Sequence, residues 1–424
     1  MHRLRHLLIA VLAISLLPAA GAQATTSGGF DELTHGAFAA AGERALIPWS
    51  ASSASERGAP IARSAGVRSA GPGDTSPDGA QLVLPGAAGT PVLGGGPDGA
   101  AVVYAAGGSV HSALVGPDGA SLIAGADHGP GTGAAVAAGP AGARVVAWTT
   151  PAEGLRAQYV GADGGPGAVV GITLGAPERV QAAVDGTGAG WLVVTRDGRL
   201  AAVRVDGATA GPLADLGQAP ATWQQAPDPR GGLWVLAAGA AAPELHHLDT
   251  SGTATRIALP PGLPRRVALA AGDGGAVLAY AAHGRGGRPD AVLRLVAAGG
   301  TPGRAIPLTR TAGRGERVDG VAVETSGATV RVLARVGRRA QVLGRTAGGR
   351  RTRTLALGET SGAGRIAAGG GHLVVASTSG REVEEEGGDG GGSNADAFGV
   401  TTLHLLQAGR RGRTLTVRSG TDTF

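Results

Sequence analysis

Histidines are the residues in this sequence most suited to metal binding, and several follow short apolar stretches. The ones considered as ligands are His111, His246, His247 and His404. They lie on predicted third strands of repeated units, so a site would need several units to contribute. Neighbouring residues on a strand point to opposite faces, so His246 and His247 cannot easily share one metal ion. We therefore expect solvated or partly buried histidines, with no metal and no cofactor.

An acidic segment offers a second possible metal site. Residues 382–396 (EVEEEGGDGGGSNAD) combine carboxylates with Ser393 and Asn394, which are oxygen ligands of the kind that calcium prefers. The spacing of an EF-hand or of a calcium-binding nonapeptide repeat is absent. Glycine-rich acidic segments bury too little surface to order themselves, so we expect a solvated loop inserted between two strands of the last unit.

Four aromatic residues occupy equivalent places near the end of the second apolar stretch of their units. They are Trp49, Tyr104, Trp148 and Tyr280. Such a ring could line a central channel or a carbohydrate platform. Aromatic residues at one repeated position more often fill the space between units, and aromatics make up only 3% of the chain. We expect them to pack between units.

Several enzyme classes are excluded by composition. The chain has neither lysine nor cysteine, which removes the Walker A loop, the Schiff base, thiolate catalysis and cysteine metal sites. Residues 94–99 match the spacing of a dinucleotide-binding loop, but an apolar strand follows them instead of a helix. Residues 249–253 (DTSGT) are a poor Asp-box. No catalytic residue can be assigned.

The strongest signal is a repeat of an apolar stretch, a glycine-rich turn and a second apolar stretch. Eight units begin at His35, Pro91, Gly133, Arg179, Thr222, Arg266, Arg317 and Arg365, with spacings of 42 to 56 residues. Most units continue with a second pair of short apolar runs around a turn, such as LAAVRVDGATAGPLADLG. Runs of four to six apolar residues are typical of strands, so each unit should have four.

Four-stranded units in this number predict an all-β fold, a β-propeller of seven or eight blades, with eight preferred. The propeller should span residues 35–420, preceded by an N-terminal segment at 25–34 and followed by a tail at 421–424. The first unit is the least regular, with serines at 50–55; the alternative to a full blade is that it is an N-terminal extension contributing only its last strand, at 81–84. A solenoid or two tandem sandwiches are the alternatives.

The turns of several units carry a recognisable motif. Asp-Gly occurs ten times in the chain, and three of these follow proline, at 77–79, 97–99 and 117–119. Proline presets φ, aspartate bonds nearby backbone and glycine tolerates positive φ, which suits a hairpin turn. SPDGAQLV from Ser76 and GPDGAAVVY from Gly96 resemble the strand-turn motif of TolB-like and related WD-type propellers. That resemblance implies a binding platform and transfers no functional residue.

The N-terminus has the features of an export signal. A basic start is followed by the apolar run 7–17 and by Ala22-Gln23-Ala24, the small-x-small pattern of a cleavage site. We predict a signal peptide at 1–24 with cleavage after Ala24, and secretion or residence in a periplasm. Without cysteine there is no lipid-modified N-terminal cysteine, and no second apolar run is long enough to span a membrane.

Charge gives limited information about partners. Cleavage would leave 35 basic and 32 acidic residues, a net charge of only +3. Residues 304–353 nevertheless hold twelve arginines against Glu316, Asp319 and Glu324. A polyanion could dock there, but the segment lacks the aromatics that would stack bases, so we expect a solvated outer face and no nucleic acid partner.

Two functional hypotheses follow from these observations. The first is a monomeric, non-catalytic binding or structural platform for an extracellular protein or glycan. The second is a glycan-directed hydrolase or lyase of the sialidase-like kind, because propellers gather loops from several blades at one axial cleft.

Overall fold

The computed structural model describes residues 32–53, 62–72, 74, 80–96, 99–116, 118–161, 163–172, 177–207, 209–238, 242–283, 289–309, 316–346, 350–368, 373–385, 395–407 and 410–421. The predicted signal peptide at 1–24 lies outside these ranges. Within them, no helix is long and apolar enough to cross a membrane.

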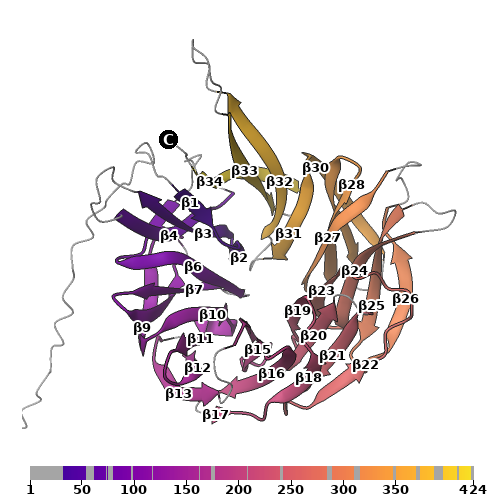
Figure 1. Ribbon diagram of the computed structural model, residues 1–424. Helices are drawn as coiled ribbons and strands as arrows, with labels where there is room; N and C mark the ends of the chain where they lie inside the picture. The colour runs from indigo at the N-terminus through magenta and orange to yellow at the C-terminus, as the bar shows by residue number, and fades with distance from the viewer. Residues whose placement is uncertain are drawn as a thin grey trace, which may run out of the picture.

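The chain folds into a β-propeller of eight four-stranded blades, as the repeat predicts (Figure 1). Each blade is an antiparallel sheet whose strands run in sequence order from the axis outward. The first strands are β1 (Glu32–His35) with β2 (Ala39–Ala41), β6 (Ala87–Gly96), β10 (Thr132–Ala138), β14 (Arg179–Val184), β19 (Thr222–Pro227), β23 (Val267–Gly272), β27 (Val318–Ser326) and β31 (Gly362–Ala368). The second strands are β3 (Arg44–Ser53), β7 (Gly99–Ala106), β11 (Arg144–Thr150), β15 (Gly190–Arg196), β20 (Leu233–Ala238), β24 (Gly275–His283), β28 (Thr329–Val336) and β32 (Leu373–Glu385).

The outer half of each blade completes the sheet. The third strands are β4 (Ala62–Ala70), β8 (Ser109–Val115), β12 (Gly154–Val160), β16 (Arg199–Asp206), β21 (Glu244–Leu248), β25 (Pro289–Ala297), β29 (Arg339–Thr346) and β33 (Ala395–Gln407). The fourth strands are β5 (Ala80–Val83), β9 (Leu122–Pro130), β13 (Pro166–Ile172), β17 (Thr209–Ala210) with β18 (Ala214–Gln218), β22 (Ala254–Ile257), β26 (Pro302–Pro307), β30 (Arg351–Glu359) and β34 (Arg410–Thr421). The 3₁₀ turn η1 (Pro140–Gly142) joins β10 to β11.

The ring closes where the two ends of the chain meet. Strand β1 pairs with β3 and also with the end of β34, through Glu32 opposite Thr421 and Leu33 opposite Gly420. Phe38 and Ile47 of blade 1 pack with Leu373 and other residues of blade 8 in one apolar cluster. A closed ring leaves no long unpaired edge, which excludes the solenoid and tandem-sandwich alternatives.

The first unit settles the number of blades, which the repeat left at seven or eight. It forms a full blade from β2 to β5, with the serines at 50–53 inside strand β3, so it contributes more than its last strand. Strand β3 (RALIPWSASS) contains the apolar run of a second strand and pairs with strands on both sides.

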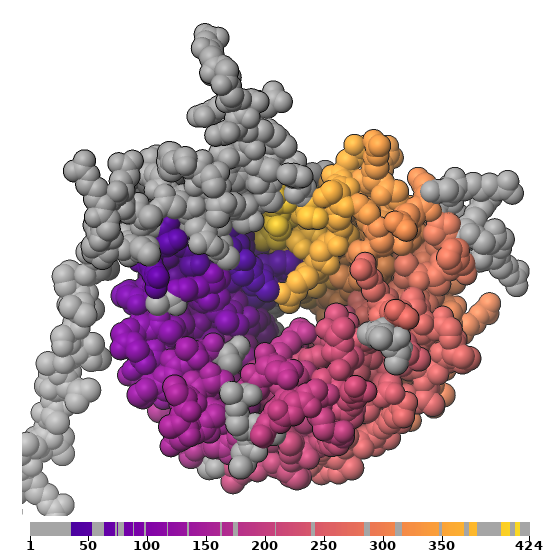
Figure 2. All heavy atoms as spheres, in the orientation of Figure 1, coloured from indigo at the N-terminus to yellow at the C-terminus, as the bar shows by residue number. Residues whose placement is uncertain are grey.

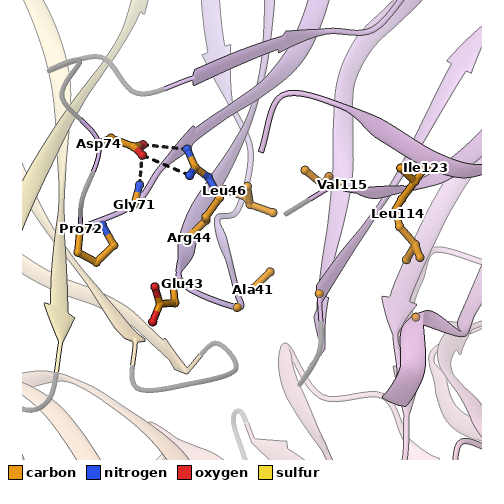
Figure 3. Close-up of a pocket in the computed structure, with 14 residues that line it drawn as sticks. Ala41, Glu43, Arg44, Leu46, Gly71, Pro72, Asp74, Leu114, Val115 and Ile123 are labelled. Carbon is orange, nitrogen blue, oxygen red and sulfur yellow. Dashed lines mark hydrogen bonds and ion pairs between the residues drawn. The ribbon is translucent and has the colours of Figure 1, made fainter. Parts of the chain in front are cut away.

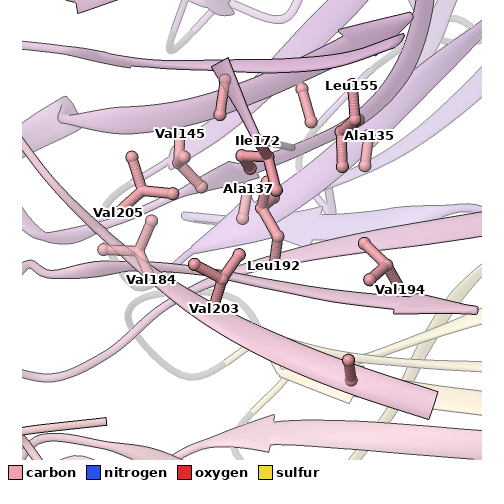
Figure 4. Packing of buried hydrophobic residues seen from close by; sticks show 13 residues of the cluster. Ala135, Ala137, Val145, Leu155, Ile172, Val184, Leu192, Val194, Val203 and Val205 are labelled. Atoms are coloured by element: carbon pink, nitrogen blue, oxygen red, sulfur yellow. The ribbon is translucent and has the colours of Figure 1, made fainter. Parts of the chain in front are cut away.

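The hydrophobic core is divided among the seams between blades. In the described residues, buried apolar side chains form eight clusters, and each cluster joins two neighbouring blades. Figure 4 shows the seam between blades 3 and 4, where Val145 and Leu155 face Leu192 and Val203. Burying each such side chain stabilises the fold by roughly 1.5–3 kcal/mol.

Around the axis, first strands rich in glycine and alanine approach one another closely. A Cβ added at Gly94 of β6 would lie 2.1 Å from the carbonyl oxygen of Val136 in β10. A Cβ at Gly96 would lie 2.4 Å from the carbonyl oxygen of Ala138. Only glycine allows this spacing, and Figure 2 shows the ring packed around a central hollow.

Candidate binding pocket

A pocket of about 500 Å³ opens on the face that carries the turns between first and second strands. We call this the first-turn face. The pocket is formed by turns of blades 1, 2 and 3: β2–β3, β6–β7, β8–β9 and the connection through η1 (Figure 3). Its lining residues are Ala41, Gly42, Glu43, Arg44, Leu46, Gly71, Pro72, Asp74, Gly99, Leu114, Val115, Gly116, Ile123 and Gly142.

An ion pair occupies one side of this pocket. Arg44 donates from Nη2 to Asp74 Oδ2 at 2.8 Å and from Nη1 to Oδ1 at 3.3 Å. The backbone N–H of Gly71 also donates to Asp74 Oδ2, and Arg413 of blade 8 donates to the Asp74 carbonyl oxygen. Such a bidentate pair holds both partners in place. The Asp74 carboxylate therefore has a structural role, because both of its oxygens already accept hydrogen bonds.

The rest of the lining is apolar with one further carboxylate. Leu114 and Val115 come from β8, and Ile123 from β9 keeps 47% of its surface exposed. Glu43 lies in the β2–β3 turn, is exposed, and forms no ion pair with any described residue. An apolar wall beside one uncompensated negative charge suits a ligand with an apolar body and a cationic group.

Buried carboxylates are where acid–base catalysis would be sought, and the described residues contain four of them: Asp185, Asp228, Asp290 and Glu324. Asp290 accepts hydrogen bonds from the N–H and Oγ1–H of Thr309. Glu324 is paired with Arg331; its burial raises its pKa, while Arg331 opposes that rise. These two carboxylates hold strands of their own blades together.

Asp185 and Asp228 have equivalent roles in blades 4 and 5. Each lies six residues before a fully buried tryptophan whose Nε1–H donates to it, Trp191 at 2.9 Å and Trp234 at 3.1 Å. Asp185 also accepts from the N–H of Gly232 in the next blade. Burial would raise the pKa of Asp185, but these hydrogen bonds outweigh it and leave the pKa below its ordinary value.

The Asp228 carboxylate likewise accepts several hydrogen bonds. It accepts three hydrogen bonds from Arg230, and His247 Nε2 lies 3.3 Å from Oδ2. Burial works against the charged form, yet the contacts from His247 and Arg230 leave the pKa of Asp228 below its ordinary value. The repeated Asp-x₅-Trp spacing is visible in the sequence, and it is the signal that could have revealed these two turns.

A buried hydrogen-bonded chain between blades 2 and 3 contains a serine and a histidine. Gln158 donates from Nε2 to the Gly167 carbonyl, so its Oε1 accepts from His128 Nδ1 at 2.6 Å. Ser112 Oγ lies 2.8 Å from His128 Nε2, and Arg144 Nε donates to the same Oγ at 3.0 Å. This arrangement has the order of a nucleophile, a base and an orienting group.

These four hydrogen-bonded side chains are enclosed by the rest of the protein. Ser112 is 1% exposed, Gln158 5% and His128 9%, so no substrate can reach the Ser112 hydroxyl in this arrangement. Arg144 is fully buried, and its burial lowers its pKa to about 10. We assign these four side chains a structural role at the seam between blades 2 and 3. No sequence motif connects the four residues, because they come from β8, β9, β11 and β12.

The histidines considered as metal ligands lie on third strands, as expected, but in three different blades. His111 stacks on Tyr104, and His404 Nε2 lies 3.0 Å from Thr378 Oγ1. His246 is buried on one face of β21, while His247 stacks on Trp234 on the other face with ring centroids 4.2 Å apart. Among the described residues, no three potential metal ligands come together.

Three of the four repeated aromatic residues, Tyr104, Trp148 and Tyr280, pack between blades as predicted. Trp148 lies with Ala101 and Val103 of blade 2, and Tyr280 lies with Trp234 of blade 5. Trp49 is buried and Tyr104 is half-buried. None of them lines the pocket.

The acidic segment 382–396 is only partly a loop. Residues 382–385 end strand β32 and residues 395–396 begin strand β33, where Glu385 is opposite Ala395. Figure 1 shows this long hairpin projecting beyond the ring. Residues 386–394, which include Ser393, Asn394 and two of the six carboxylates considered for calcium, lie outside the described part of the chain.

Comparisons with known proteins assign no family to this chain. No family model and no curated protein matches the sequence. Among solved structures, the chain is similar to the dihydro-heme d1 dehydrogenase NirN in complex with DHE, with 14% identity and a TM-score of 0.44, over 92% of this chain and 74% of that one. It is also similar to virginiamycin B lyase from Staphylococcus aureus, with 10% identity and a TM-score of 0.39, over 68% and 90%. A TolB-like protein from Agrobacterium tumefaciens has 14% identity and a TM-score of 0.34, over 57% and 82%. The strand topology of this chain is that of an eight-bladed β-propeller.

Proposed function

We propose that this chain is an exported, non-catalytic binding propeller, and that its ligand site is the pocket of blades 1 to 3. The proposal rests on the interactions of the carboxylates. Among the described residues, the four buried carboxylates and Asp74 are all engaged by hydrogen bonds or ion pairs, and Glu43 is the acid of the pocket lining that forms no ion pair. General acid–base catalysis needs a positioned pair of groups, and the described lining offers one acid without a base.

The ligand that fits this lining is a small molecule or peptide end with an apolar body and an ammonium or guanidinium group. Leu114, Val115 and Ile123 would contact the apolar body. Glu43 would attract the cation, since the positive charge of Arg44 is already balanced by Asp74. Export is expected from the signal-like residues 1–24, and it would place this site outside the cytoplasm.

The proposal is tested by titrating the mature protein with a fluorophore-labelled alkyltrimethylammonium probe and with its alkylsulfonate counterpart. We expect the cationic probe to bind more tightly. Glu43→Gln should weaken its binding by roughly three- to tenfold, because one partly exposed ion pair is lost. Glu178→Gln, an exposed acid at the opposite face, should change nothing.

Two results would contradict this proposal. One is binding of the cationic probe to the Glu43→Gln protein as tightly as to the unchanged protein. The other is steady turnover of any member of a broad glycan panel by the purified protein, which would favour the sialidase-like hydrolase or lyase instead.

A further inference from the structure

The outer rim of the seam between blades 6 and 7 carries an unusual concentration of arginine. We call this surface the arginine seam, and its members are Arg304 of β26, Arg345 of β29, Arg350 of the β29–β30 turn, and Arg351 and Arg353 of β30. All except Arg345, which is half-buried, are exposed. Five of the twelve arginines in residues 304–353 thus come from neighbouring elements, β26 of blade 6 and β29, β30 and the turn between them in blade 7.

Strand register places Arg304, Arg345 and Arg351 on facing walls. Arg353 lies beyond a shift in the register of β29 and β30, next to Thr354, whose partner is Leu343, so Arg353 belongs to the outer edge of blade 7 and not to this wall. Arg345 is directly opposite Arg351, so both point to the same side of blade 7. Arg345 Nη2 donates to the Pro307 carbonyl in blade 6 at 3.2 Å, which identifies that side as the one facing blade 6. On the other wall, Ile306 packs into the core between blades 6 and 7, and Arg304 lies two residues before it on the same side of β26.

The charges of four members of the seam are not balanced by the described carboxylates. Arg304, Arg350, Arg351 and Arg353 form no ion pair with any described residue, and the Arg351 guanidinium donates to Thr354 Oγ1 at 2.8 Å. Among the acids of these blades, Asp290 is engaged by Thr309, Glu324 by Arg331 and Asp319 by Arg335, and Glu359 lies at the far end of β30, opposite Arg339.

We propose that the arginine seam binds a linear glycan carrying repeated phosphate or sulfate groups. The planar fork of arginine matches the oxygens of such groups. The arginines are spread over three strands of two blades. A chain with several anionic groups can contact more of them at once than one small ion can. Residues 304–353 contain no aromatic residue on which bases could stack, which favours a glycan over a nucleic acid. The seam lies apart from the pocket of blades 1 to 3, so this inference does not depend on the proposed function.

The test uses the mature full-length chain and dextran sulfate, with uncharged dextran of the same length as the reference. We expect binding to dextran sulfate only, weakening as salt rises from about 50 to 200 mM. The double variant Arg351→Gln/Arg353→Gln should bind about tenfold more weakly, and its dependence of log K on log salt should be shallower by about one to two units.

The matched control is Arg265→Gln/Arg266→Gln, which removes the same charge from exposed residues at the opposite face of blade 6. It should bind dextran sulfate like the unchanged protein, and thermal melting should show that both double variants are folded. Equal weakening in the two double variants, or no binding by the unchanged protein, would overturn the proposal. Tighter binding of single-stranded DNA than of dextran sulfate, lost in Arg351→Gln/Arg353→Gln, would also overturn it in favour of a nucleic acid.

Discussion

Single polar residues buried in this molecule act mainly at the seams between blades. Asp185 joins blade 4 to blade 5 through Gly232, and Ser112 joins blade 2 to blade 3 through Arg144. A buried polar group without a partner costs free energy comparable to a lost hydrogen bond, so each such group favours one docking of its two blades. Histidines in such places are kept neutral, which makes stability depend on pH.

Acid should destabilise the protein through these histidines. Burial lowers the pKa of His35 to about 4, with Arg68 contributing, and burial also lowers the pKa of His128 and His246. Because the unfolded chain then binds more protons than the folded one, stability is full above pH 6.5 and falls as the pH drops toward 4. The contribution of His35 is at most about 3 kcal/mol, reduced by its partial exposure.

The measurement is the free energy of unfolding by urea at several pH values between 7.5 and 4.5, an interval set by these pKa values. His35→Gln should flatten the curve, whereas His283→Gln, which changes an exposed histidine at the end of β24, should leave its slope as it was. A profile for His35→Gln that runs parallel to that of the unchanged protein would show that His35 does not contribute.

At the scale of the element, the composition of each strand follows its distance from the axis. The first strands of blades 1 to 3 contain AAA, GGG and GAAVAA, and the second strands contain the large residues Trp148, Trp191 and Trp234. Blades are wedge-shaped because their sheets converge at the axis, so small residues are needed inside and bulky ones farther out. At Gly94 the space near the axis is too small even for a Cβ atom.

Gly94→Ala should destabilise the propeller by about 2 kcal/mol, since its Cβ would overlap the backbone of Val136 and the two first strands must separate. Gly125→Ala in β9 is the matched control. No atom outside its chain neighbours lies within 4 Å of a Cβ at Gly125, so its effect should stay within about 0.5 kcal/mol. Thermal and urea unfolding compare the two, and equal stabilities would refute the close-packing argument.

At the scale of the whole molecule, the two ends of the chain close the ring. Residues 32–41 supply the first strand of blade 1, and β34 completes blade 8 beside it. The closing seam also contains the Arg365 guanidinium 5.6 Å from the Phe38 ring and the hydrogen bond from Arg413 to Asp74. Closure therefore depends on residues more than 300 positions apart.

Ending the chain at residue 409 should open the ring, because it removes β34 and leaves the edge of β33 unpaired. Compared with a chain of residues 25–424, we expect a lower melting temperature and association that increases with protein concentration. Gel filtration with light scattering measures the association. A shortened chain that remains monomeric with an unchanged melting temperature would mean that blade 8 holds the ring together without its outer strand.

The sequence by itself predicted four-stranded units, where most of them begin, a preference for eight blades over seven, and that Trp148 and Tyr280 pack between blades. Those features are local: short apolar runs and Asp-Gly turns fix hairpins whatever the neighbours are. Only the tertiary structure decided that the first unit is a full blade, that Ser112, His128 and Arg144 meet, and that Glu43 shares a pocket with Ile123. The physical reason is that these contacts cross between blades, so ring geometry brings together residues that no sequence spacing relates.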